Sequence, residues 1–208
     1  DGRYYAPDAA LIKGNSLYNT AVRNTGNPVT PIDVVGADDW VIRGNLIADF
    51  IKGRKDQTSY GAFVKGNARG TLLERNLVIC EMHLAGHPGI RVGLSLGGGG
   101  TGASYCRDSD CSTEHRDGVI RNNLVLNCAN DVGIYLNRAA GSKVYNNTLY
   151  RTVGIDARFA ETDADIRNNV LTGRIKGRDG ASVSEADNLI GSRREFEHWF
   201  MEPDAADF

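Results

Sequence analysis

The sequence has little proline, no long apolar run and almost no net charge. Only 5 of its 208 residues are proline, whereas 25 are glycine. No apolar run approaches the roughly 18–20 residues that a membrane-spanning helix needs, so we expect no membrane span. The formal net charge of −2 gives the chain no global attraction to nucleic acid, and we expect no such partner. Abundant glycine and asparagine instead indicate many tight turns with left-handed backbone.

A nucleotide-binding motif is also missing, although one segment is rich in glycine. The segment "GLSLGGGGTG" (93–102) fits the spacing G-x-G-x-x-G through Gly97, Gly99 and Gly102. That spacing indicates a dinucleotide site only where a helix follows, and no helical pattern follows here. No Gly-Lys-Ser/Thr follows either, which excludes a P-loop. We interpret the glycines as the end of a strand and the exit into a long insertion.

Cysteine is sparse, with four residues in the chain. Cys106 and Cys111 lie in one short polar segment and are near enough to close a small loop, whereas Cys80 and Cys128 end two similar apolar runs. Four cysteines allow three pairings, and spacing does not choose between them. A zinc site would need further closely spaced ligands. Disulfides would indicate an oxidising compartment, so we expect a secreted, periplasmic or cell-surface protein.

What the sequence does contain is a repeat that ends on asparagine. Segments such as "WVIRGN", "GVIRNN" and "ADIRNN" are each followed by a short apolar run. The asparagines that end the units are Asn15, Asn45, Asn76, Asn123, Asn147, Asn169 and Asn188. Apolar residues alternate within each unit, which is the period of a strand and not of a helix. We predict that these asparagines adopt positive φ at tight bends and form hydrogen bonds from one unit to the next.

Strands that recur without helices predict an all-β solenoid whose units bury their inward faces against one another. This pattern resembles the right-handed parallel β-helix proteins, and the resemblance implies about seven rungs with loop insertions. We predict a β-helix domain over residues 1–192 and a non-repeating segment over residues 193–208 that caps the last rung. No cap is visible before the first rung. We therefore expect an oligomer partner or further N-terminal residues there.

A second strand in each unit indicates a working face. Aligning "PIDVVG", "GAFVKG", "GLSLGG", "GIYLNR", "GIDARF" and "RIKGRD" gives two apolar columns and two outward columns. The outward columns are Asp33, Phe63, Ser95, Tyr135, Asp156 and Lys176, and Val35, Lys65, Gly97, Asn137, Arg158 and Arg178. Rungs about 4.8 Å apart would make a strip about 25 Å long, which suits an extended oligosaccharide. The simpler interpretation is that these side chains merely face water.

The strip is locally basic, which favours an acidic polysaccharide as partner. Cleaving a uronate chain by β-elimination requires a group that neutralises the carboxylate, a base and a proton donor. We predict that Arg158 and Arg178 bind the carboxylate, Lys65 acts as the base and Tyr135 donates the proton. Gly97, Asn137, Asp156 and Lys176 complete the predicted substrate-binding set, in which Gly97 leaves room for a sugar ring. Lys65, Tyr135 and Arg158 are the predicted catalytic residues.

Around Lys65 the segment "GAFVKGN" resembles the alginate lyase and chondroitinase-B group of polysaccharide lyases. The resemblance implies that Lys65 is the catalytic base of a secreted lyase. The group's Arg-His-Gly in the next rung is replaced here by Gly97 and Gly98, and the acidic calcium ligands before the lysine are missing from "QTSYGAF". A non-catalytic β-helix module that binds glycan or builds a surface assembly is the alternative function.

Metal sites have only weak support in the sequence. His83 and His87 with Glu81 could bind a metal, but Gly86 and Pro88 argue against a helix that would present both histidines. The insertion "CRDSDCSTEHRD" carries four acids without the EF-hand spacing. They are Asp108, Asp110, Glu114 and Asp117. We therefore predict no metal and no cofactor, with calcium in this insertion as the alternative.

Overall fold

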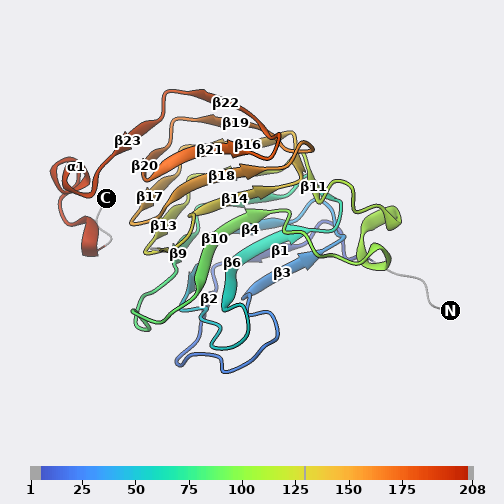
Figure 1. Cartoon of the computed structure of the whole chain (residues 1–208), viewed down its shortest axis with the longest axis horizontal. Helices are drawn as coiled ribbons and strands as arrows, with labels where there is room; N and C mark the ends of the chain where they lie inside the picture. Colours follow the sequence, from blue (N-terminus) through green and yellow to red (C-terminus); the bar gives the residue numbers. More distant parts are fainter. Residues whose placement is uncertain (1–5, 129, 206–208) are drawn as a thin grey trace.

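The chain folds into stacked parallel β-sheets with very little helix (Figure 1). The computed structural model describes residues 6–128 and 130–205. Residues 1–5 and 129 of the predicted β-helix domain therefore lie outside the described residues, as do residues 206–208 of the predicted C-terminal segment. Successive strands of the chain enter different sheets, and the two seven-stranded sheets gain one strand per repeat. This arrangement is compatible with a parallel β-helix.

Four sheets contain the strands. The first seven-stranded sheet contains β1 (Leu11–Lys13), β4 (Val41–Arg43), β8 (Leu72–Glu74), β12 (Val119–Arg121), β16 (Ser142–Tyr145), β19 (Asp163–Arg167) and β22 (Ser182–Ala186). The second contains β2 (Ser16–Tyr18), β5 (Leu46–Ala48), β9 (Leu77–Ile79), β13 (Leu124–Leu126), β17 (Thr148–Tyr150), β20 (Val170–Thr172) and β23 (Leu189–Gly191). The six-stranded sheet contains β3 (Ile32–Val35), β6 (Thr58–Lys65), β10 (Ile90–Leu96), β14 (Ile134–Asn137), β18 (Gly154–Arg158) and β21 (Arg174–Arg178). A three-stranded sheet contains β7 (Ala68–Arg69), β11 (His115–Arg116) and β15 (Ala139–Ala140).

The core is built from inward side chains that stack in register from one strand to the next. In the first seven-stranded sheet, Ile42, Leu73, Ile120 and Val144 occupy paired positions and are fully buried. Each inward face therefore finds its apolar partners in the neighbouring repeats, which is how a solenoid buries surface without a separate core layer.

The asparagines that end the repeats form a continuous hydrogen-bonded ladder, as the sequence predicted. The Nδ2 of each donates to the Oδ1 of the next, from Asn15 to Asn45 at 3.1 Å and through to Asn169 and Asn188 at 2.9 Å. The same oxygen also accepts the backbone N–H of the preceding asparagine. The ladder lies at the corner between the two seven-stranded sheets and joins every repeat to its neighbours.

The prediction that these asparagines adopt positive φ is wrong. The left-handed residue is the one directly before each of them. These residues are Gly14, Gly44, Arg75, Asn122, Asn146, Asn168 and Asp187, with φ between 54° and 70°. The bend and the ladder are therefore made by two adjacent residues. The first residue turns the chain at the surface, and the second directs its amide inward.

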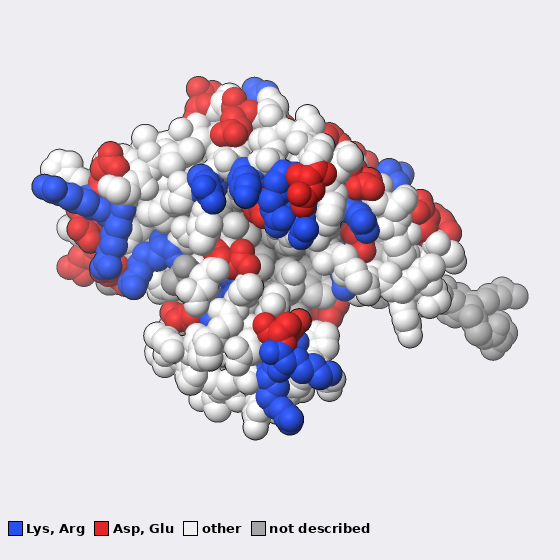
Figure 2. Space-filling view, viewed as in Figure 1, with Lys and Arg blue, Asp and Glu red and all other residues white. Residues whose placement is uncertain are grey.

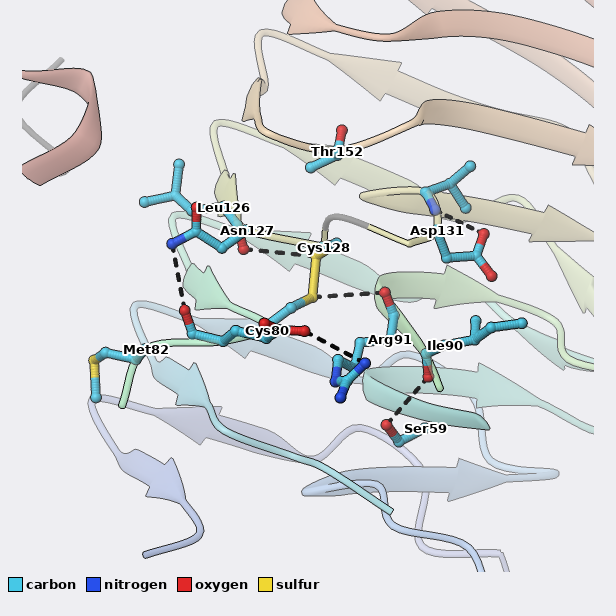
Figure 3. Close-up of a disulfide and its surroundings, with 12 residues drawn as sticks. Ser59, Cys80, Met82, Ile90, Arg91, Leu126, Asn127, Cys128, Asp131 and Thr152 are labelled. Atoms are coloured by element: carbon cyan, nitrogen blue, oxygen red, sulfur yellow. Dashed lines mark hydrogen bonds and ion pairs between the residues drawn. A yellow bond between two sulfur atoms is a disulfide. The ribbon is translucent and has the colours of Figure 1, made fainter. Parts of the chain in front are cut away.

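All four cysteines are paired, as Cys80–Cys128 and Cys106–Cys111. Cys80 and Cys128 are fully buried and follow neighbouring strands β9 and β13 (Figure 3). Cys106 and Cys111 close a small loop at the surface within the insertion after β10. The structure thus selects one of the three possible pairings, and two disulfides fit an oxidising compartment.

Buried charged residues fix the loop that follows Cys80. Arg91 is only 2% exposed; its guanidinium donates to the carbonyls of His87 and Gly89 and lies 3.3 Å from Glu81 Oε1. From the other side, the buried Asp49 accepts backbone N–H groups of residues 82–84. The loop is thereby held beside the N-terminal end of β10, as Figure 3 shows around Arg91.

The repeat ends with β23, and α1 (Arg193–Trp199) follows it. Ser192 and Glu195 form a capping box at the start of this helix. Phe196 of α1 is buried on the outer face of the second seven-stranded sheet, where it stacks on Tyr150 with ring centroids 5.2 Å apart. The segment therefore covers a side of the stacked sheets, while Leu189 and Ile190 of the last strand remain about half exposed. Three short 3₁₀ helices complete the structure: η1 (Ala103–Tyr105), η2 (Arg107–Ser109) and η3 (Pro203–Ala205).

Candidate functional site

The six-stranded sheet aligns the predicted site residues in the register that the sequence indicated. Asp33 pairs with Phe63, Phe63 with Ser95, Ser95 with Tyr135, Tyr135 with Asp156, and Asp156 with Lys176. In the second column Asn137 pairs with Arg158, which pairs with Arg178. Both columns therefore lie on one outward face, because alternate residues of a strand point to the same side.

This face is less open than the sequence suggested. Phe63, Ser95, Tyr135 and Asn137 are buried, although their side chains point away from the core. The strands β6 and β10 begin earlier than the repeat pattern, and their extra residues add an outer apolar cluster. This cluster consists of Tyr60, Val92, Val132 and Tyr135. The Tyr60 ring also meets Phe63 edge-on, with centroids 5.4 Å apart. The face is therefore a groove with walls and not a flat strip.

Two pockets lie along the groove and share a wall. The first has a volume of about 220 Å³ and is lined by Asp33, Lys52, Phe63 and Lys65. The second has a volume of about 180 Å³ and is lined by Asp131, Tyr135, Asp156, Arg158 and Arg178. Thr58 and Tyr60 line both pockets. The predicted residues are thus divided into two groups, with Lys65 in one pocket and Tyr135 in the other.

Figure 2 shows a hollow on this side of the molecule, with Lys and Arg side chains gathered in a row along its upper side, near the place of β18 and β21 in Figure 1. A larger hollow of about 540 Å³ lies elsewhere, beside β2 at the N-terminal end of the sheets. Among the described residues that line it, Arg23 is the only charged group. Another hollow of about 340 Å³ is lined by Asp8, Arg107 and Asp108, and Arg107 there is paired with Asp8 and Asp38. The groove brings together the predicted site residues, so we take it as the candidate site.

Lys65 is a cation of the first pocket that has Asp33 nearby but forms no close ion pair. Its Nζ lies 4.7 Å from the centre of the Phe63 ring and 3.4 Å from the carbonyl oxygen of Gly99. Within the part of the chain that the structure describes, no carboxylate forms an ion pair with this ammonium group. By contrast, Lys52 in the same pocket is buried and paired with Asp56 at 2.5 Å. Lys65 is therefore the cation of this pocket that is most available to a ligand, while its charge also acts on Asp33.

The second pocket holds a connected network of arginines and acids. Arg178 Nε lies 2.8 Å from Asp156 Oδ2, and Arg158 Nε lies 2.5 Å from Asp179 Oδ2. Hydrogen bonds to Asp179 and to the Tyr135 hydroxyl raise the pKa of Arg158, so its charge is secure. Asn137 Nδ2 donates to the same hydroxyl at 3.1 Å. Tyr135 and both predicted carboxylate-binding arginines thus share one pocket.

Burial changes the acid–base character of two groups that the sequence had not indicated. Burial is the main cause that raises the pKa of Tyr60 to about 12, so Tyr60 stays a neutral hydroxyl between the two pockets. Burial also raises the pKa of Asp131 in the second pocket. Strict alternation along β6 would place Tyr60 on the inward side with Ala62 and Val64, so the repeat pattern does not indicate its place in the outer cluster. Asp131 lies between repeats and has no signal in the pattern either.

The structure gives Gly97 a packing role. It is buried with φ 73°, and a Cβ atom there would clash with the carbonyl oxygen of Asn137. The next two glycines then pass between Lys65 and Asn137, since a Cβ on Gly98 would lie 3.3 Å from Lys65 and one on Gly99 3.6 Å from Asn137 Nδ2. The floor that we predicted to be open at Gly97 is occupied by the chain itself.

Metal ligands do not come together in the described part of the chain. No three His, Cys, Asp or Glu side chains of residues 6–128 and 130–205 group in a way that would hold an ion. Glu114, one of the acids considered for calcium, is buried and accepts the N–H of Gly66 at 2.9 Å and the hydroxyl of Thr101 at 3.1 Å. It therefore fastens the insertion 97–114 to the corner after β6.

These features define an all-β protein of stacked parallel sheets with a groove on one outer face. Within the described residues, no helix is both long and apolar enough to cross a membrane. Comparisons of the chain with protein families, with curated proteins and with solved structures find no match. The fold and the groove are thus the basis for a functional proposal.

Proposed function

We propose that this chain is a secreted right-handed parallel β-helix protein of about seven rungs that binds an acidic polysaccharide along the groove of its six-stranded sheet. The observation that carries the proposal is Lys65, an ammonium group that forms no close ion pair among the described residues, although Asp33 lines the same pocket. Six strands about 4.8 Å apart offer about 24 Å of groove, which suits several sugar units of an extended chain.

The side chains of the groove fit a uronate chain. Cations stand in both pockets, with Lys65 in the first and Arg158 and Arg178 in the second. Tyr60 and Phe63 offer aromatic surface beside the lysine. Charged groups on one rigid face, with apolar rings between them, favour a polymer that alternates carboxylates with apolar sugar faces.

We further propose lyase activity as the catalytic form of this binding. A neutral Lys65 amine would take the proton α to the carboxylate, and Arg158 would neutralise that carboxylate. The C–O bond at the β carbon then breaks, a C=C bond forms in the ring, and Tyr135 protonates the leaving oxygen. That Tyr135 and Arg158 line the same pocket supports this assignment, because the proposed proton donor and the proposed carboxylate-binding group would then act on one sugar.

One observation favours the non-catalytic alternative, a module that only binds glycan or builds a surface assembly. Lys65 and Tyr135 line different pockets, and Tyr60 lines both of them. Two strand spacings, about 9.6 Å, separate β6 from β14 in the sheet. A base and a proton donor that act on one sugar need to be closer than that unless both side chains reach toward Tyr60.

The test is binding and cleavage on a panel of polyuronates. We expect Lys65→Ala to weaken binding about tenfold, as loss of one charge-assisted contact would. Lys143→Ala is the matched control, because Lys143 is an exposed lysine of the first seven-stranded sheet and should leave affinity unchanged. In a lyase, Lys65→Ala and Tyr135→Ala would both abolish the ultraviolet absorbance of the unsaturated product. Binding without that product by the wild type would support the non-catalytic module, and no binding to any polyuronate would refute the proposal.

A further inference from the structure

The residue directly after each strand of the six-stranded sheet has left-handed backbone. In the first three strands it is glycine: Gly36, Gly66 and Gly97, with φ between 66° and 75°. In the last three it is Arg138, Phe159 and Asp179, with φ of 51°, 71° and 55°. Glycine adopts this conformation freely, whereas a bulky residue there is a true outlier. At the last three corners, a residue with a side chain thus occupies a position that glycine fills in the first three.

Phe159 is the least expected of these residues, and its ring has a defined place. The guanidinium carbon of Arg138 lies 4.8 Å from the ring centre and that of Arg158 lies 4.4 Å from it. Both distances are in the range of cation–π contacts. Backbone strain that the surroundings maintain is typical of binding and catalytic sites. The strained aromatic residue thus stands in direct contact with the main cation of the second pocket.

Asp179 holds the same arginine from another direction. Its Oδ2 lies 2.5 Å from Arg158 Nε and 3.3 Å from Arg178 Nη1, so one carboxylate joins both guanidinium groups. Arg158 is therefore fixed by the Phe159 ring and by Asp179. A guanidinium fixed before the ligand arrives loses less side-chain freedom on binding.

We propose that Phe159 is a positioning residue that, with Asp179, presets Arg158 to receive the carboxylate of a uronate in the second pocket. This proposal rests on the proposed function, because it names the ligand group of the same groove. Phe159 does not touch the ligand; it acts through Arg158. Glycine at this left-handed corner after β18 would remove the strain, but it would also remove the ring that holds the Arg158 guanidinium.

The experiment compares the wild type with Phe159→Leu and Phe159→Tyr. Leucine keeps apolar bulk but removes the π face, whereas tyrosine keeps it. The Nε–Hε signal of Arg158 in NMR relaxation reports its mobility without any ligand, and titration with an oligouronate reports affinity. We expect the Arg158 signal to become mobile and affinity to fall about fivefold to tenfold in Phe159→Leu, with wild-type behaviour in Phe159→Tyr.

Arg75→Leu is the matched control, because Arg75 has φ 54° at an exposed corner between β8 and β9, which belong to the two seven-stranded sheets and not to the sheet of the groove. It should change neither readout. An Arg158 signal that stays rigid in Phe159→Leu would overturn the positioning role, whatever the affinity. If the wild type binds no uronate while Phe159→Leu still frees Arg158, the positioning role stands and the ligand assignment, together with the proposed function, is overturned.

Discussion

Two corners of the repeat can be compared: the asparagine corner between the two seven-stranded sheets, and the corner directly after the six-stranded sheet. Both use left-handed backbone, but with different side chains. At the asparagine corner, a left-handed residue precedes a ladder asparagine in all seven units, and the five inner asparagines are buried. At the corner after the six-stranded sheet, the left-handed residue is glycine in three strands and Arg138, Phe159 or Asp179 in the others. The first corner repeats one inward hydrogen-bonding residue, and the second varies outward side chains. The left-handed residue varies at both corners, and what stays constant at the first corner is the asparagine that follows it.

The largest effect should come from breaking the asparagine corner. Asn123 is 2% exposed; its Oδ1 accepts two hydrogen bonds from Asn76, and its Nδ2 donates to Leu73 and Asn147. Asn123→Ala leaves several of these groups buried and unpaired, so we expect a loss of about 3 kcal/mol or more in the free energy of unfolding. Urea denaturation measures this loss.

The neighbouring residue gives the control for this comparison. Asn122 is exposed and left-handed, with φ 54°, and turns the chain without entering the ladder. Asn122→Gly keeps that conformation and should change stability by no more than about 0.5 kcal/mol. Equal losses in both variants would show that the bend, and not the buried amide, carries the stability of this corner.

His115 tests whether the interior behind the corner after the six-stranded sheet is closed to water. It pairs with Ala68 and Ala139 in the three-stranded sheet, is fully buried and has no hydrogen-bond partner on either ring nitrogen among the described residues. Burial lowers the pKa of His115 from 6.5 to about 3. Because the pKa of His115 is lower in the folded protein, neutral His115 makes its full contribution to the free energy of unfolding above pH 6.5. That contribution is lost as pH falls toward 3.

The size of this effect is intermediate. Each pH unit below 6.5 lowers the free energy of unfolding by about 1.4 kcal/mol, so the loss reaches about 2 kcal/mol by about pH 5. His115→Leu should remove this part of the pH dependence, so the difference between the two unfolding curves grows as pH falls. Parallel curves between neutral pH and about pH 5 would mean that water or a hydrogen-bond acceptor reaches the ring and stabilises its protonated form.

The smallest effect should come from glycine substitutions that compare the two corners directly. Arg75 and Phe159 share left-handed φ values of 54° and 71°. Arg75→Gly should stabilise the protein by no more than about 1 kcal/mol and leave polyuronate binding unchanged. Phe159→Gly should weaken binding even where thermal unfolding shows a folded protein. Equal binding by both variants would remove the functional distinction between the corners.

The sequence was sufficient for most of the fold, because its signal is periodic. The asparagine units and the alternating apolar residues predicted the stacked strands, and the pairing of Tyr135 with Asp156 follows from that alignment. The conformation of the corner was predicted one residue too late. Either of two adjacent polar residues can make such a bend, and only the buried ladder decides which one points inward.

The site was less predictable, because it depends on segments outside the period. Tyr60 and Val92 belong to extensions of β6 and β10, and they bury Tyr135 and divide the groove. The glycines after β10 fill the floor by passing between Lys65 and Asn137, which no strand alignment could indicate. Phe159 looks like an ordinary apolar residue until its backbone and its two arginine neighbours are known.

The central claim is that the outer face of the six-stranded sheet binds acidic polysaccharide while the asparagine corner only supports it. NMR titration of the wild-type protein with an oligouronate tests this claim most directly. We predict that the backbone amide signals of Lys65, Tyr135, Arg158 and Arg178 shift with ligand concentration, while those of Arg75 and Asn122 do not. Shifts confined to the corner residues or to the seven-stranded sheets, or no shifts at all, would contradict it.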